Sequence, residues 1–364
     1  MFKSLISVVI FALVCASSLK ASAVEVAELD KSAVKVADRS QQEKNQALKQ
    51  AMQDVVLKNT GNREALDAPL VQQAIAEPTA YIRQFGYQER EGQQYLQASF
   101  DHTKIINLLR QAQLPVWGKQ RPLTLLWLAQ ENDGQRELLN DSSLSENRAS
   151  IADFSQARGL PMMLPIMDLD DSMAISVNDV RGMFADQVAK ASQRYHSDYF
   201  AMVSLDITPD GQFSYNLTLY PASSEQPLFN PLVTQTAQVA DVDAALSSIF
   251  EAISQYYVER YAIADSGEAN TTQVTFIDIT DRQQLLDIES YLSQLSAVKS
   301  VSLTRLQGIT AEFSLQLFGS EEDLYRLISL EPRIHSQDKL NAEPMLDPLS
   351  SSQTPPQEYI WQGR

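Results

Sequence analysis

The chain has 364 residues, of which 44% are hydrophobic and 21% charged, and a formal net charge of −17 at pH 7. This length exceeds one ordinary hydrophobic core, so we expect two or three domains. The negative charge argues against binding to nucleic acid or to an anionic membrane surface, because both select basic patches. After the N-terminal region, no stretch approaches the roughly 18–20 unbroken apolar residues that span a bilayer, so no membrane span is expected.

Residues 1–23 have the pattern of a secretory signal peptide. Lys3 supplies positive charge, Ser4–Leu19 form an apolar segment, and Ala21-Ser22-Ala23 is a small-x-small cleavage site. This pattern predicts export to the periplasm. Cys15, the single cysteine, lies inside the apolar segment, so the processed chain would hold no disulfide. Lipid attachment at Cys15 is the alternative, and Val14 is bulky for the small residue that such processing prefers.

Residues 24–130 are predicted to form an N-terminal α+β domain with the order α-α-β-β-α-β. A capping pattern at Ser40 and Glu43 predicts the start of the first helix, and Gly61 predicts its end. The further predicted elements are a helix over 69–78, hairpin strands containing Phe85–Tyr87 and Leu96–Phe100, a helix over 101–115 and a buried strand over Leu123–Ala129.

Residues 140–264 are predicted to form a middle α/β domain with the order α-β-α-β-β-α. A capping pattern over Ser143 to Glu146 predicts a helix that ends at Gly159. Pro165 cannot donate to a strand ladder, so Met162–Met167 is expected at a sheet edge or as an irregular segment. The remaining predicted elements are a long helix capped at Ser176 with Met183 and Phe184 facing inward, a hairpin over Tyr199–Ile207 and Phe213–Tyr220, and a helix over Val242–Tyr257.

Residues 270–331 are predicted to form a C-terminal module with the order β-α-β-β-α, which is typical of ferredoxin-like interaction modules. Residues 341–364 mix proline with serine, glutamine and asparagine, so they are predicted to be a disordered tail in which Trp361 is exposed. The fold class is therefore α+β, with three small layered α/β modules. The predicted elements of the module are strands Val274–Ile279, Val298–Leu303 and Ile309–Leu317, and helices capped by Asp281 and Ser320.

The sequence lacks the common catalytic motifs. The three histidines, His102, His196 and His335, are far apart and fall in no zinc-binding pattern. The chain has no G-x-S-x-G nucleophile elbow and no glycine-rich phosphate loop. We therefore expect no enzymatic activity and no cofactor.

One group of oxygen-bearing side chains has the spacing of a calcium loop. Met173 stands where the tight turn of such a loop needs glycine, and the preceding segment is predicted as a strand instead of a helix. The preferred interpretation is a turn over Asp168–Ser172 followed by a helix cap, and no metal site. The residues at the ligand positions are Asp168, Asp170, Ser172, Ser176 and Asp179.

Arg194 is the second residue of interest in the middle domain. We expect it to pair with Asp168 or Asp171 and to hold the end of the strand in place. The alternative is an arginine that faces a ligand.

Several stretches together resemble an exported Gram-negative family, the domain of unknown function 2066, over residues 25–330. The resemblance implies a periplasmic α/β protein of several modules, and it brings no activity and no site residues. The stretches are Ala47-Leu48 to Gly61, Phe100-Asp101, Val116-Trp117-Gly118 with Arg121-Pro122, Arg158-Gly159-Leu160-Pro161 through Leu164-Pro165 to Asp168, and Ala191-Ser192 with Arg194-Tyr195.

These features predict a periplasmic, non-enzymatic protein that acts as an interaction or assembly-support module of the cell envelope, with an envelope protein as partner. One alternative is a periplasmic binding or regulatory protein that acts on cell-wall enzymes or glycan. Another is a hydrolase with an unrecognised site. An exposed apolar patch or an open sheet edge would favour the first hypothesis, and a deep cleft with converging polar groups would favour the hydrolase. The sequence leaves the oligomeric state open.

Overall fold

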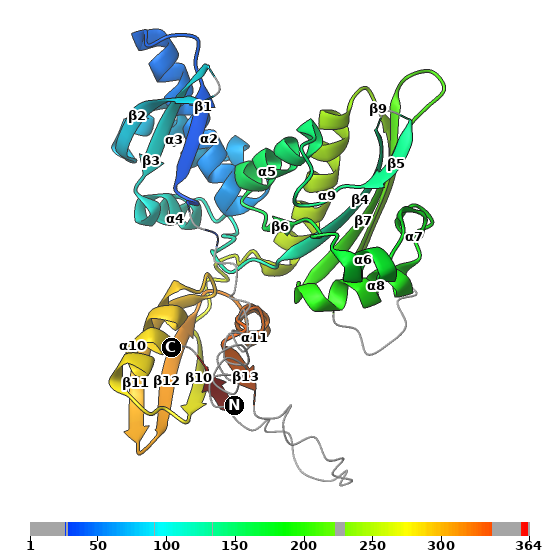
Figure 1. Ribbon diagram of the computed structural model, residues 1–364. Helices are drawn as coiled ribbons and strands as arrows, with labels where there is room; N and C mark the ends of the chain where they lie inside the picture. The colour runs from blue at the N-terminus through cyan, green and yellow to red at the C-terminus, as the bar shows by residue number, and fades with distance from the viewer. Residues whose placement is uncertain are drawn as a thin grey trace, which may run out of the picture.

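The computed structural model describes residues 26, 28–90, 92–132, 134–222, 230–336 and 358–362. These residues form three α/β domains, each built on its own sheet, which confirms the α+β class (Figure 1). The predicted signal peptide and most of the predicted tail lie outside the described residues.

The first domain packs helices on one face of an antiparallel sheet with strand order β1-β3-β2. Helix α2 begins where the Ser40 side chain accepts from the Glu43 amide, and it ends at Gly61, whose φ is 64°. Strand β1 was not predicted from the sequence. The elements are β1 (Lys31–Lys35), α2 (Gln41–Thr60), η1 (Arg63–Asp67), α3 (Pro69–Ala76), η2 (Pro78–Ala80), β2 (Ile82–Arg90), β3 (Gln93–Phe100) and α4 (His102–Gln111).

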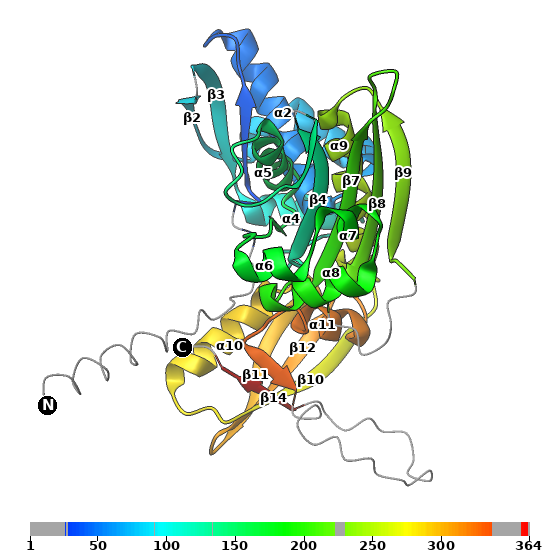
Figure 2. The ribbon, with the colours of Figure 1, turned by 45° about the vertical axis from the view of Figure 1, so that its right-hand side comes forward.

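The middle domain is a sheet with strand order β5-β4-β7-β8-β9 and with helices on both faces (Figure 2). Strand β4 was expected to close the first domain, and the structure places it here, parallel to β7. Leu126 and Trp127 belong to two different hydrophobic clusters, which explains the continuous apolar run of a strand covered on both sides. The elements are β4 (Thr124–Asn132), β5 (Gln135–Leu138), α5 (Glu146–Arg158), β6 (Met162–Met163), α6 (Leu169–Ala174), α7 (Val177–Arg181), α8 (Ala185–Ser192), η3 (Gln193–Tyr195), β7 (Tyr199–Ile207), β8 (Phe213–Pro221), β9 (Val233–Val239) and α9 (Val242–Tyr261).

Two predicted helix boundaries in this domain are wrong. Helix α5 is capped by Ser145, whose side chain accepts from the Arg148 amide, while Ser143 accepts from the Asn140 amide and closes a turn. The predicted long helix is divided into α7 and α8, because Met183 between them has a φ of 55°. Helix α6 occupies the predicted turn, and strands β5 and β9 were not predicted.

The C-terminal domain has the predicted order β-α-β-β-α, followed by two further strands. The expectation of a disordered tail is wrong for the described residues 358–361, which form β14 between β10 and β13. Trp361, expected to be exposed, is 5% exposed and packs 5.7 Å from the Tyr291 ring. The elements are β10 (Asn270–Ile277), α10 (Arg282–Gln294), β11 (Val298–Gln307), β12 (Thr310–Leu317), α11 (Glu321–Ile328), β13 (Ile334–Ser336) and β14 (Glu358–Trp361).

The first and C-terminal domains share one topology. The strand order β1-β3-β2 and the helices α2 and α4 correspond to the order β10-β12-β11 and the helices α10 and α11. The C-terminal domain adds β14 beside β10, whereas no described strand lies on the outer side of β1.

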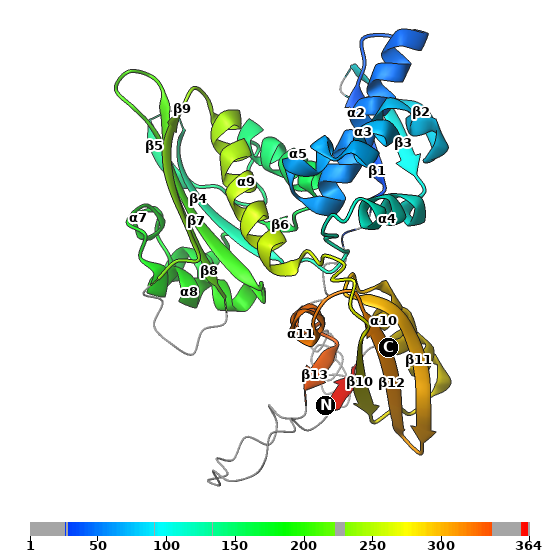
Figure 3. The same ribbon diagram turned by 180° about the vertical axis from the view of Figure 1, so that it is seen from behind.

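The three domains meet at one junction (Figure 3). Val116 and Ile263 exchange backbone hydrogen bonds of 2.8 and 2.9 Å. The Arg110 guanidinium donates to the Ile263 carbonyl at 2.6 Å and to the Ser296 carbonyl at 2.7 Å, and it lies 4.1 Å from the centroid of the Phe318 ring. Arg110 in α4 therefore ties the first domain to the C-terminal domain.

Candidate functional site

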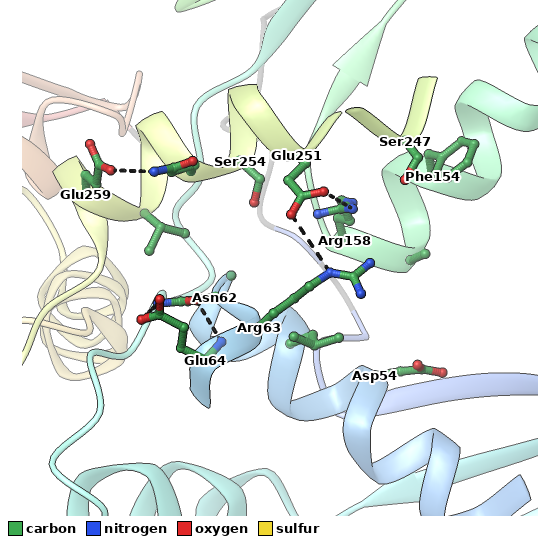
Figure 4. Close-up of a pocket in the computed structure, with 15 residues that line it drawn as sticks. Asp54, Asn62, Arg63, Glu64, Phe154, Arg158, Ser247, Glu251, Ser254 and Glu259 are labelled. Carbon is green, nitrogen blue, oxygen red and sulfur yellow. Dashed lines mark hydrogen bonds and ion pairs between the residues drawn. The ribbon is translucent and has the colours of Figure 1, made fainter. Parts of the chain in front are cut away.

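A groove of about 650 Å³ lies between the first and middle domains (Figure 4). Its walls are the end of α2 with η1 on one side and helices α5 and α9 on the other. Gly61 brings these walls together, since a Cβ added there would lie 2.1 Å from Val258 Cγ2. The groove is thus a product of close packing between two domains.

Charged side chains from both domains converge on Glu251 in this groove. Arg63 Nε lies 3.9 Å and Arg158 Nη2 lies 3.8 Å from the Glu251 carboxylate (Figure 4). Burial lowers the pKa of Arg158, and Glu251 opposes this shift while Arg63 adds to it. The arginines therefore hold Glu251 through loose ion pairs, at distances longer than a hydrogen bond.

Several of the other polar groups of the groove are bonded to neighbours. Asp54 accepts from the Ser32 hydroxyl at 2.6 Å, and Glu259 accepts from the Gln255 amide at 3.0 Å. None of the three histidines lines the groove. The groove therefore presents one carboxylate flanked by two arginine side chains.

Arg121 lies buried beside the groove and joins its two walls. Its guanidinium donates to the carbonyls of Gly159 at 2.7 Å and Trp117 at 3.1 Å, and also to the carbonyl of Lys58. Burial lowers the pKa of Arg121 to about 9. Lys58 and Gly159 lie at the C-terminal ends of α2 and α5, where carbonyl groups lack helical partners and favour a cation.

The predicted partner of Arg194 is confirmed. The guanidinium donates to both carboxylate oxygens of Asp168 at 2.6 and 2.7 Å and to Asp171 at 3.0 Å. The Tyr195 hydroxyl also donates to Asp171, which is 1% exposed. Hydrogen bonds from Arg194 lower the pKa of Asp168 to about 2. This network fixes the start of α6 on η3, directly after α8.

The residues at the calcium-loop positions have separate structural roles. Asp168 caps α6 and binds Arg194, and the Ser172 hydroxyl donates to the Asp168 carbonyl at 2.7 Å. Asp179 forms a reciprocal capping box with Ser176 at the start of α7. Asp170 is exposed in the first turn of α6. Across the described residues, no group of three or more His, Cys, Asp or Glu side chains is placed to hold a metal ion.

An exposed apolar surface on the middle domain was not recognised in the sequence. Leu169 and Met173, one helical turn apart on α6, are each 72% exposed, and Phe184 at the start of α8 is 56% exposed. The inward orientation expected for Phe184 is therefore wrong. Its ring instead lies close to Gly182, because the chain reverses at Met183. We name these three residues, with the exposed Asp170 and Asp186, the α6–α8 surface.

The signal for this surface was present in the sequence. Leu169 and Met173 have helical spacing, but three aspartates within the five residues Asp168–Ser172 favoured a turn. Within the part of the chain that the structure describes, no helix is long and apolar enough to cross a membrane.

Comparisons with known proteins place two family models on the chain. Residues 23–118 match a domain of unknown function, DUF8605, and residues 270–354 match DUF2066. A search of curated proteins found no match. Similar solved structures include a Xanthomonas campestris protein of the family model DUF330, with 13% identity, a TM-score of 0.16 and coverage of 39% of this chain and 83% of that chain. Formyltetrahydrofolate deformylase from Burkholderia mallei has 9% identity, a TM-score of 0.14 and coverage of 53% and 88%.

The two structural similarities are too low to carry an argument. The family model DUF2066 matches the C-terminal domain and part of the segment after it, whereas the stretches on which the resemblance was based lie at residues 47–195. Residues 270–354 therefore match DUF2066, the family that the chain was expected to resemble over residues 25–330, and residues 23–118 match a different family model.

Proposed function

We propose that the protein is an exported, non-enzymatic interaction protein that supports assembly in the cell envelope. The observation that carries this proposal is the α6–α8 surface. Its three large apolar side chains are 56–72% exposed on the neighbouring helices α6 and α8, and exposed apolar patches are typically places where another protein binds.

The chemistry of the remaining polar side chains supports a binding role. Arg194, Asp168 and Asp171 bond to one another, and Arg121 bonds to backbone carbonyls. These side chains hold helices and domains in place, and their hydrogen-bonding groups are used within the protein. The junction around Arg110 supports the same role, because domains tied by buried hydrogen bonds present their outer surfaces in a fixed arrangement.

Site-specific photo-crosslinking in living cells tests the interaction. A benzoylphenylalanine in place of Met173 is expected to give discrete protein adducts, and Leu169→Ser in the same chain is expected to remove them. A benzoylphenylalanine in place of Leu286, which is 45% exposed on α10, is the matched control. Adducts that are absent at position 173, or identical at both positions, would contradict the proposal.

Export is tested separately. The periplasmic fraction is expected to hold a chain that begins at Val24, measured by intact mass. A full-length chain in the cytoplasm, or a lipidated Cys15, would contradict this part of the proposal.

A second candidate function is the binding of a small cell-wall glycan fragment in the groove. The groove volume of about 650 Å³ favours it, since ligand sites commonly measure about 300–1,000 Å³. Calorimetric titration with a soluble glycan fragment should give binding heat that Arg158→Gln reduces. Equal heat with both chains would exclude the groove as the site.

A further inference from the structure

The first domain carries an exposed surface whose character is opposite to that of the α6–α8 surface. Phe85 on edge strand β2 is 47% exposed, and the Lys44 ammonium lies 5.6 Å from the centroid of its ring. The Arg39 guanidinium lies 4.9 Å from the centroid of the Tyr87 ring. We name Arg39, Lys44, Phe85 and Tyr87 the β2 surface. It combines aromatic rings with cations.

The cations of this region outnumber its carboxylates. Residues 31–49 and 82–90 hold seven Lys or Arg and three Asp or Glu. Two of the three carboxylates serve the start of α2, since Asp38 accepts from the Ser40 amide at 2.7 Å and Glu43 accepts from the Ala37 amide at 3.4 Å. The third, Glu89, is exposed near the end of β2. Lys31 pairs with Glu28 at 2.8 Å, so Arg39 and Lys44 are the cations beside the exposed Phe85 ring and the half-buried Tyr87 ring.

The α6–α8 surface has the reverse balance. Residues 166–190 hold five aspartates against Arg181 and Lys190. Arg181 pairs with Asp206 of β7, and Arg194, just beyond this segment, is held by Asp168 and Asp171. Asp170 and Asp186 remain exposed beside Leu169 and Phe184, while Lys190 lies in the last turn of α8. Apolar side chains with acidic neighbours therefore face solvent here.

The two surfaces cannot meet within one molecule in this arrangement. Strand β2 lies in the first domain and helix α6 in the middle domain, far apart in Figures 1 and 3. Arg110 and Arg121 tie the domains between them through buried hydrogen bonds. Two complementary surfaces on separate domains of one chain fit a heterologous, head-to-tail contact between copies.

We propose that the α6–α8 surface of one copy binds the β2 surface of a second copy, so that the chain assembles head to tail. This inference rests on the proposed function and names its partner. The exposed ring of Phe85 and the half-buried ring of Tyr87 would cover Leu169, Met173 and Phe184, and Arg39 and Lys44 would face Asp170 and Asp186. Burial of apolar area stabilises such a contact, and the opposite charges orient it.

Two double variants test the geometry. The first, Leu169→Ser with Met173→Ser, removes the α6–α8 surface and leaves the β2 surface intact. The second, Phe85→Ser with Lys44→Ser, does the reverse. Leu306→Ser, which changes a residue 54% exposed on β11, is the matched control. Circular dichroism and thermal melting first establish that each variant folds.

Sedimentation velocity then measures the self-association of each chain. The wild-type and control chains should associate with rising concentration, and each double variant alone should associate at least tenfold more weakly. An equimolar mixture of the two double variants should give a dimer and nothing larger, because it holds one intact pair of surfaces. Raising the salt from about 0.05 M to about 0.5 M should weaken wild-type association, since salt screens the charges.

Three outcomes would overturn the inference: a wild-type chain that stays monomeric, a mixture that does not restore the dimer, or equal association in all chains. The photo-crosslinking separates this failure from failure of the proposed function. Adducts between position 173 and a different envelope protein would support the interaction role and would exclude a second copy as the partner.

Discussion

The guanidinium carbon of Arg121 lies 3.9 Å from the centroid of the Trp117 ring, and Arg121 Nη2 also donates to the Trp117 carbonyl at 3.1 Å. Both side chains are almost completely buried. A stacked, buried arginine is stable only if its donors find acceptors, and here backbone carbonyls of α2 and α5 provide them. This pair is therefore a joint between the first and middle domains.

Arg121→Met should destabilise the protein by about 3 kcal/mol, because it leaves buried carbonyls at two helix ends without donors. For a chain of this size, we expect thermal melting to show a fall in Tm of about 6 °C or more. Arg148→Met is the control, since Arg148 forms an exposed pair with Asp141 that is worth at most about 1 kcal/mol. Equal losses in the two variants would show that Arg121 does not join the domains.

Gly159→Ala should lower stability more than Gly308→Ala. The φ angles are 59° and 61°, so both variants carry the same backbone strain. A Cβ at position 159 would lie 2.7 Å from Arg121 Nη1, whereas at position 308 it would meet nothing within 4 Å. Chemical denaturation of both variants measures the difference. If the two glycines proved interchangeable, Arg121 would not be held tightly against α5.

Asp168→Asn should reduce stability at neutral pH and lose its effect in acid. The pKa of Asp168 is lowered to about 2 in the folded protein, from an ordinary value of 3.8. Between these values the unfolded chain binds more protons, so stability falls as the pH drops through this window. The Tm difference between the wild-type and variant chains should therefore shrink between about pH 5 and pH 2. A difference that stays constant across that range would contradict the role of the Arg194 pair.

Trp361→Ala should destabilise the C-terminal domain by about 3 kcal/mol, as expected for the removal of a buried aromatic side chain. Trp361 packs against Tyr291 and lies 4.7 Å below the Arg333 guanidinium. Glu358→Ala in the same strand changes an exposed residue and should have an effect within about 0.5 kcal/mol. Hydrogen exchange of the β10 amides measures the local loss. Unchanged protection in Trp361→Ala would show that β14 is dispensable.

Local sequence signals were sufficient to predict many of the helices. Ser40 and Ser320 cap the predicted helices, because a cap depends on residues three positions apart. The order of the C-terminal module was also predicted, since its strands alternate clearly and its turns carry glycine or a helix cap.

Local signals do not predict which strands pair across a long stretch of sequence. The strand around Leu126 was recognised, but nothing in its own residues says that its neighbour is β7, more than seventy residues later. Trp361 was read as part of a polar tail, because four ordered residues gain their stability from β10 and β13. At the candidate sites, the Arg194 pair followed from charge, whereas the groove and the α6–α8 surface depend on how separate helices pack.

Strand β14 imposes an order of events on synthesis. It stands between β10 and β13, although residues 358–361 are made more than eighty residues after β10 begins. While the ribosome still holds these residues, the backbone groups of β10 that later pair with β14 have no strand beside them. The first domain has all the strands of its sheet within residues 31–100, so it can fold while the rest of the chain is still being made. The sheet of the C-terminal domain, with the same topology at its centre, is complete only after its last strand has been made.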